Sequence, residues 1–170
     1  MKTRTFSDFL SHMETTGIAS RKELIGCTPD EIAILESRYS LVLPEAYRNY
    51  LAVMGHSSGR LLTHDHYAAR YEHVLQMTEE YREFIDEYPD EPHVTLPPDA
   101  LTIVGRLGQQ FLMIRCNQAN DSKVWYFNDE SANLREVYSS VMDWLYSTAK
   151  EAKDAIDGGY YDWFPNGTRP

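Results

Sequence analysis

Apolar residues recur at intervals of three and four through the first third of the chain, which is the spacing of one buried helix face. A first amphipathic helix is expected from Phe6 to Met13. A second has a stronger start signal, because Thr28 and Glu31 form a capping box and Pro29 suits the first helical position. In the third, LVLPEAYRNYLAVMG, we expect one buried face and a left-handed glycine cap at its end. The residues that define this third helix are Leu43, Pro44, Tyr47, Tyr50, Leu51, Met54 and Gly55.

A longer helical pattern covers residues 67–88, and two prolines, Pro89 and Pro92, follow it. Its apolar and aromatic positions alternate in steps of four and three, so they share one face. That face consists of Tyr67, Tyr71, Val74, Thr78, Tyr81, Ile85 and Tyr88. The acidic residues lie roughly opposite and are expected to face solvent.

The period then shortens to that of β-strands. Short apolar runs at 101–106, 111–116 and 123–128 predict an antiparallel meander with Gly108 in its first turn, and Trp125 and Phe127 opposite Val124 and Tyr126. A last helix is expected at 134–156, capped by Asn133 and Glu136, before an aromatic tail that packs back on the body. The fold class is therefore α+β, with a small antiparallel sheet of three or more strands packed against several helices. We expect a single domain over 1–170.

Charge restricts the class of partner. The formal net charge is −10, and the segment 79–91 carries seven acids against one arginine, which supplies −6 of it. Such a chain is a poor ligand for nucleic acid, whose phosphates require clustered Lys and Arg. The acidic run is either a solvated face or a docking surface for a basic protein. On the second interpretation the binding residues are Glu79, Glu83, Asp86, Glu87 and Asp90.

Catalytic and metal-binding motifs are weak or missing in this sequence. Cys27 and Cys116 are not spaced as metal ligands and suit free thiols in a reducing compartment. His64 and His66 are separated by one residue, a spacing that is a poor zinc signal between helices. The N-terminus lacks the apolar core of a signal peptide, and we find no membrane-spanning run. We therefore expect a cytoplasmic protein that is not an enzyme, with no catalytic residue, metal or cofactor.

Several of these motifs together resemble the SUKH superfamily over roughly residues 28–150. The resemblance rests on the LPEAYRNYL helix, the glycine turn after it, a hairpin with Gly105 and Gly108, and a strand that ends in VWYFND. Leu43, Pro44, Tyr47, Tyr50, Leu51 and Gly55 match the helix motif of the family. All of these are structural positions, and the N-terminal helix and aromatic tail are additions to them.

The resemblance implies a non-enzymatic α+β module that binds proteins. Many bacterial members are immunity proteins that neutralise polymorphic toxins, often nucleases, and an acidic protein suits the basic groove of a nuclease. The alternative is a cytoplasmic scaffold or regulator without a toxin partner, as for the fungal relatives that regulate cell-wall synthesis. An enzyme is favoured only by the histidines around His64 and His66. The sequence specifies neither the partner nor the oligomeric state.

Overall fold

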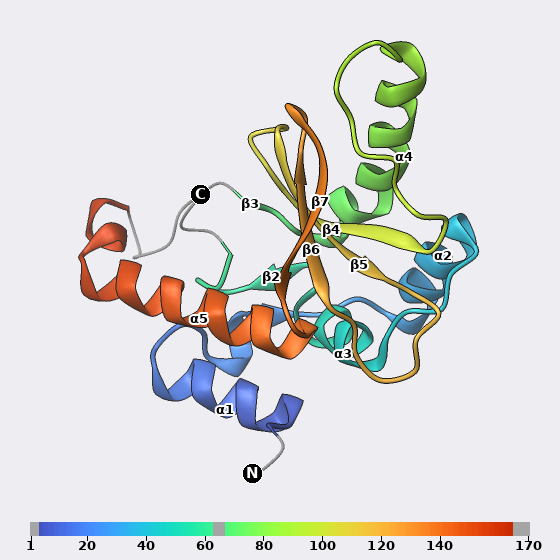
Figure 1. Cartoon of the computed structure of the whole chain (residues 1–170). Coiled ribbons are helices and arrows are strands. Elements are labelled where there is room, and N and C mark those ends of the chain that lie inside the picture. The colour runs from blue at the N-terminus through green and yellow to red at the C-terminus, as the bar shows by residue number, and fades with distance from the viewer. Residues whose placement is uncertain (1–3, 63–66, 165–170) are drawn as a thin grey trace.

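The computed structural model describes residues 4–62 and 67–164, which form an α+β fold (Figure 1). Its helices are α1 (Phe6–Thr15), α2 (Pro29–Tyr39), α3 (Glu45–Met54), α4 (Tyr71–Glu87) and α5 (Val141–Asp157). An antiparallel sheet contains, in spatial order, β3 (Tyr67–Ala68), β4 (Ala100–Arg106), β5 (Gln110–Arg115), β6 (Val124–Asn128) and β7 (Ser131–Tyr138). Two short strands, β1 (Leu24–Ile25) and β2 (Ser57–Ser58), pair separately, and two 3-10 helices are η1 (Arg21–Glu23) and η2 (Tyr160–Trp163). The fold class expected from the sequence is confirmed.

The predicted capping box opens α2. The Glu31 amide donates to Thr28 Oγ1 at 3.2 Å, and the Thr28 amide donates to Glu31 Oε2 at 2.8 Å. Two of the helix's first amide groups, which have no partner within the helix, are thereby satisfied. The start of α2 is fixed, which matters because two of the polar residues discussed below lie there.

The third predicted helix is α3, and its inner face is the centre of the main core. Pro44 stands at its N-cap. Leu43, Tyr47, Tyr50, Leu51 and Met54 are all at most 2% exposed, as the spacing predicted. Tyr50 stacks against Tyr47 and meets Trp144 of α5 edge-on at 5.6 Å between ring centroids. The core therefore joins α3 directly to α5.

The two faces of the sheet belong to two hydrophobic clusters. Ile114 and Val124 are in the main core with α3 and α5. Met113 and Phe127 point the other way, into a second cluster with Tyr81 of α4. Figure 1 shows α4 on the opposite side of the sheet from α1, α3 and α5. The predicted alternation along β6 is confirmed, since Val124 and Phe127 lie in different clusters.

A buried hydrogen bond ties α4 to the sheet. The amide of Thr102 donates to Thr78 Oγ1 at 2.8 Å, at the point where the pairing of β4 with β5 shifts register. Gly105 lies three residues further along β4, where a Cβ would stand 2.9 Å from the sulfur of Met77 in α4. A side chain at position 105 would force the Met77 side chain to move, so glycine permits the close approach.

The predicted capping of the last helix by Asn133 and Glu136 is wrong. Residues 131–138 form β7, and α5 begins at Val141, where Ser140 Oγ accepts from the Asp143 amide at 3.0 Å. Glu136 lies across from Trp125 and pairs with Lys123 at 2.8 Å. Pairing with β6 outweighs the local capping pattern, because cross-strand contacts stabilise a strand that its own sequence does not specify.

Two further boundaries differ from those expected. Residues 67–68 are the edge strand β3, with Tyr67 paired to Arg106, so α4 starts at Tyr71 instead of Tyr67. Tyr88, expected on the inner face, follows the end of α4 and is 47% exposed. The left-handed cap expected at Gly55 is also absent, because its φ is −62°. Glycine is required there for another reason, which is that a Cβ would lie 2.4 Å from Cys27 Sγ.

The segments at both ends of the chain pack onto the body. Phe9 of α1 meets Tyr146 of α5 at 5.2 Å between ring centroids, and the two helices lie side by side in Figure 1. In η2, Tyr161 is 3% exposed and its hydroxyl donates to the Arg60 carbonyl at 3.2 Å. The expectation that the aromatic tail packs back is confirmed for Tyr161, whereas Trp163 is 87% exposed.

Candidate functional site

The acidic face of α4 consists of the five residues selected from the sequence. Tyr81 and Val74 anchor the opposite side of the helix in the two clusters, which turns this face to solvent. All five acids are exposed: Glu79, Glu83, Asp86, Glu87 and Asp90, the last lying just beyond the helix. The structure thus places four of the predicted residues on the exposed side of α4 and the fifth just beyond its end.

Glu79 differs from the other four members of the acidic face. Its carboxylate forms an ion pair with Arg38 of α2. The single basic residue of the run, Arg82, is directed elsewhere, since it donates to the Pro97 carbonyl at 3.1 Å. Within residues 4–62 and 67–164, the carboxylates of Glu83, Asp86, Glu87 and Asp90 have no ion-pair partner, so the C-terminal half of the face is the more available part.

An apolar groove of about 360 Å³ runs beside the acidic face, between α4 and the turn that joins β4 to β5. Its walls include Met77, Tyr81, Phe84 and Phe111, and its rim carries Glu80 and Asp129. A second hollow continues past Phe84 to Tyr88, with Glu91 and Glu130 at its edge. Apolar walls with an acidic rim suit an apolar side chain that is flanked by basic residues.

The turn between β4 and β5 forms one edge of that groove. Leu107 and Gly108 both have positive φ, 55° and 69°, and the Gln109 amide donates to the Arg106 carbonyl at 3.1 Å. The predicted role of Gly108 as a turn residue is confirmed. Leucine rarely adopts a positive φ. The side chain of Leu107 is also 68% exposed. An apolar side chain therefore projects into solvent from a tightly fixed turn.

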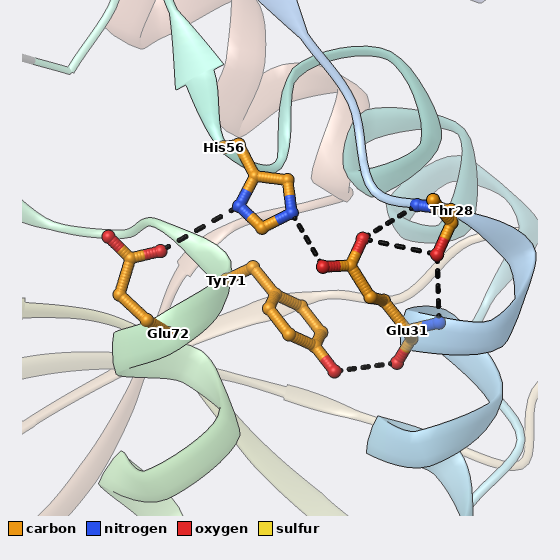
Figure 2. Close-up of polar contacts among 5 residues, drawn as sticks. All are labelled: Thr28, Glu31, His56, Tyr71 and Glu72. Carbon is orange, nitrogen blue, oxygen red and sulfur yellow. Dashed lines mark hydrogen bonds and ion pairs between the residues drawn. The ribbon is translucent and has the colours of Figure 1, made fainter.

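A separate polar cluster lies around His56, where the starts of α2 and α4 meet the segment after α3 (Figure 2). His56 Nε2 is 3.0 Å from Glu31 Oε1, and its Nδ1 is 3.8 Å from Glu72 Oε2. Tyr71 packs edge-on against the imidazole, and its hydroxyl donates to the Glu31 carbonyl at 2.8 Å. One histidine is thus held between two carboxylates from different helices.

Cys27 borders the same cluster. Its amide donates to the Leu51 carbonyl at 2.8 Å, and its side chain is buried. Burial, reinforced by the nearby carboxylates of Glu31 and Glu72, raises the pKa of the thiol to about 12. The thiol is therefore protonated at neutral pH and is a poor nucleophile.

No sequence motif combines these residues, because 25 positions separate Glu31 from His56. The only local signal is the four-residue spacing of Cys27 and Glu31 across the start of a helix. The histidines selected instead, His64 and His66, lie outside the described residues. Hence the histidine that meets a carboxylate and a thiol is not one that the motif search favoured.

The structural motif residues serve the fold. Leu43, Tyr47, Tyr50 and Leu51 are buried in the main core, and they offer no surface to a partner. No helix within the described part of the chain has the length and apolar character needed to span a bilayer.

A family model matches the greater part of the chain. The chain matches the SMI1 / KNR4 family (SUKH-1) over residues 26–147. A comparison with curated proteins finds no match. The matched region starts just before Cys27 and ends within α5, so it contains both the acidic face and the cluster around His56.

Proposed function

The chain belongs to the SMI1 / KNR4 family (SUKH-1), and on that basis we propose that it is a non-enzymatic module that binds a basic protein. Its function is that of an immunity protein that neutralises a bacterial polymorphic toxin, of which a nuclease is the best-suited class. The observation that carries the proposal is the row of exposed, unneutralised carboxylates on α4 beside an apolar groove.

The spacing of these acids favours binding to a basic partner. Glu83 and Glu87 are one helical turn apart, and Asp86 lies between them on the same side. Like charges at this spacing repel one another in the free protein. Lys and Arg of a partner would relieve that repulsion and would also steer the encounter, which speeds association at low salt.

The groove supplies what charge alone does not. Exposed charges contribute to association rate and selectivity, whereas apolar and aromatic anchors in pockets provide most of the binding free energy. Phe84 and Leu107 are 36% and 68% exposed on opposite sides of the groove. We place an apolar side chain of the partner between them, with its basic neighbours on the acidic face. Glu79, held by Arg38, contributes least.

Three further properties belong to this proposal. The absence of catalytic activity is supported by the raised pKa of the Cys27 thiol, which disfavours a nucleophile beside His56. A single domain over residues 1–170 is supported by the packing of α1 against α5. The cytoplasm is the compartment in which such a protein meets an incoming toxin, and free buried cysteines suit its reducing conditions.

The first test is protection. The toxin domain encoded beside the gene is produced in cells with and without this chain, and survival is counted. We expect survival only when the chain is present, and a complex of the two proteins in gel filtration. Survival that does not depend on the chain contradicts the immunity function, and a neighbourhood without a toxin gene favours the scaffold or regulator instead.

The second test locates the interface. Glu83→Lys with Glu87→Lys should slow association with the toxin domain by about tenfold or more and weaken its salt dependence. The matched control is Glu14→Lys with Glu151→Lys, which makes the same change in charge at exposed positions of α1 and α5. Stopped-flow kinetics at several salt concentrations measure both. Equal rates for the two pairs would place the interface elsewhere on the molecule.

A further inference from the structure

Three metal-ligating atoms meet at the start of α2. Cys27 Sγ, a carboxylate oxygen of Glu31 and a ring nitrogen of His56 all lie within 4.8 Å of one another. They come from the segment that leads into α2, the first turn of α2 and the segment after α3. A thiol, an imidazole and a carboxylate converge here on one point, from segments that a metal ion would join.

We propose that Cys27, Glu31 and His56 bind a divalent transition metal, with zinc as the preferred ion, and that Glu72 orients His56 for this role. The site is independent of the proposed partner surface on α4. The ion would link the start of α2 to the segment that follows α3.

The donor set selects the class of metal. Sulfur and nitrogen ligands favour zinc and its neighbours, whereas Ca²⁺ and Mg²⁺ take oxygen ligands. Three protein ligands from Cys, His and Glu leave one tetrahedral position, which a water molecule fills in comparable zinc sites. The cluster therefore suits Zn²⁺ with three protein ligands and one open position.

The geometry is close to what zinc requires. Zinc bonds of about 2.0–2.3 Å in a tetrahedron put neighbouring ligand atoms about 3.3–3.8 Å apart. His56 Nε2 and Glu31 Oε1 are already 3.0 Å apart, joined by a hydrogen bond that the ion would replace. Cys27 Sγ needs an approach of about 1.2 Å at most, because a Zn–S bond and a Zn–N or Zn–O bond at a tetrahedral angle set a spacing of about 3.6 Å.

The surroundings of His56 support this role. If Nε2 binds the ion, Nδ1 carries the ring proton, and Glu72 Oε2 lies on that side at 3.8 Å. Metal-binding histidines commonly donate their second ring N–H to a carboxylate, which fixes the tautomer and ring orientation. Glu31 is itself held by Thr28, whose amide donates to its other carboxylate oxygen at 2.8 Å.

Binding of a cation would also offset the negative charge of the carboxylates around Cys27. The thiol is buried beside the carboxylates of Glu31 and Glu72. A divalent cation offsets those two negative charges and stabilises the thiolate, while the thiol proton leaves to solvent. Gly55 leaves room for the sulfur, because a Cβ there would lie 2.4 Å from Sγ.

The test uses the full chain, purified and stripped of metal with a chelator. Co²⁺ is added first, because a cobalt–thiolate bond gives a charge-transfer band in the near ultraviolet and tetrahedral cobalt absorbs strongly in the visible. We expect both signals at one ion per chain. Zinc at a hundred-fold excess over its Kd should displace the cobalt and raise the melting temperature by about 5–10 °C.

Variants distinguish metal binding at Cys27, Glu31 and His56 from metal binding elsewhere on the chain. Cys27→Ser and His56→Ala should each abolish the charge-transfer band, and Glu72→Gln should keep the band with about 10–100-fold weaker affinity. Controls are Cys116→Ser, which removes the other thiol, and His64→Ala with His66→Ala, which removes the other histidine pair. Circular dichroism checks that each variant is folded. If Cys27→Ser does not fold, the result for His56→Ala decides whether the site exists.

Either of two results would overturn the site. One is a stripped chain that shows no cobalt–thiolate band at stoichiometric metal. The other is a band that survives Cys27→Ser and disappears in Cys116→Ser or in the His64/His66 variant.

Discussion

Replacing Leu51 by alanine tests whether α3 holds the main core together. Leu51 is 0% exposed and lies in the cluster that joins α3 to the sheet and α5. The change removes three carbon atoms, which at about 0.8 kcal/mol each is a transfer loss of about 2.4 kcal/mol. The cavity left behind adds to this, because the ring pairs around it are fixed by their own packing. We therefore expect unfolding to become easier by about 3–4 kcal/mol, within the range of about 2–5 measured for buried leucines.

The assay is urea unfolding followed by circular dichroism. A matched control is Ile34→Ala on α2, which also removes three carbon atoms from a helix but at a side chain that is 54% exposed. Its loss should stay below about 0.5 kcal/mol. The slope of the transition should be unchanged in both variants, so that the midpoints report stability alone. A loss below about 0.5 kcal/mol for Leu51→Ala would refute the packing described for α3.

Two further substitutions test other contacts. Thr78→Val keeps the shape but leaves the buried Thr102 amide without an acceptor, so stability should fall by about 1–3 kcal/mol in urea unfolding. Thr148→Val is its control, because that buried hydroxyl only donates to the Trp144 carbonyl of its own helix, and an equal loss would contradict the reasoning. Hydrogen bonds from the amide and hydroxyl of Ser20, with the charge of Arg60, lower the pKa of Glu23 against the opposing effect of burial. Its carboxylate therefore stabilises the fold above about pH 4.3, and the contribution is lost as the pH falls through the lowered pKa. Glu23→Gln should lose less stability than Leu51→Ala at pH 7, with the difference from the parent chain shrinking to nothing in acid, and a constant difference would exclude this ion as its cause.

Helices with local start signals could be predicted well from the sequence. The capping box at Thr28 and the apolar spacing through Leu51 depend on residues a few positions apart, so both can be recognised in the local sequence. The strands β3 and β7 could not, because each is stabilised by pairing with another strand, β4 or β6, and not by a pattern in its own sequence. Tyr67 is ordered by Arg106, and Glu136 by Lys123 and the neighbouring strand. Local capping patterns at Asn133 therefore pointed to the wrong element.

The candidate sites divide in the same way. The acidic face could be read directly, since Glu83 and Glu87 share a helix and a face. Its adjoining groove could not, because Phe84 and Phe111 meet only when α4 lies on the sheet. The cluster around His56 depends on three separate segments, and no spacing within one of them predicts it. The prediction of a left-handed cap at Gly55 was wrong for a related reason. Glycine is needed there because a Cβ would collide with Cys27 Sγ, which is distant in the sequence.

The contact between α1 and α5 has a consequence for how the protein is synthesised. Phe9 meets Tyr146 across almost the whole length of the chain. A ribosome adding about 5–20 residues per second needs roughly 7–27 s between them, so α1 emerges long before its helical partner. The strands from β4 to β7 pair only with sequence neighbours and can form as they emerge. The apolar stripe of α1 is therefore among the last surfaces to be covered, because it stays without its helical partner until α5 has been synthesised.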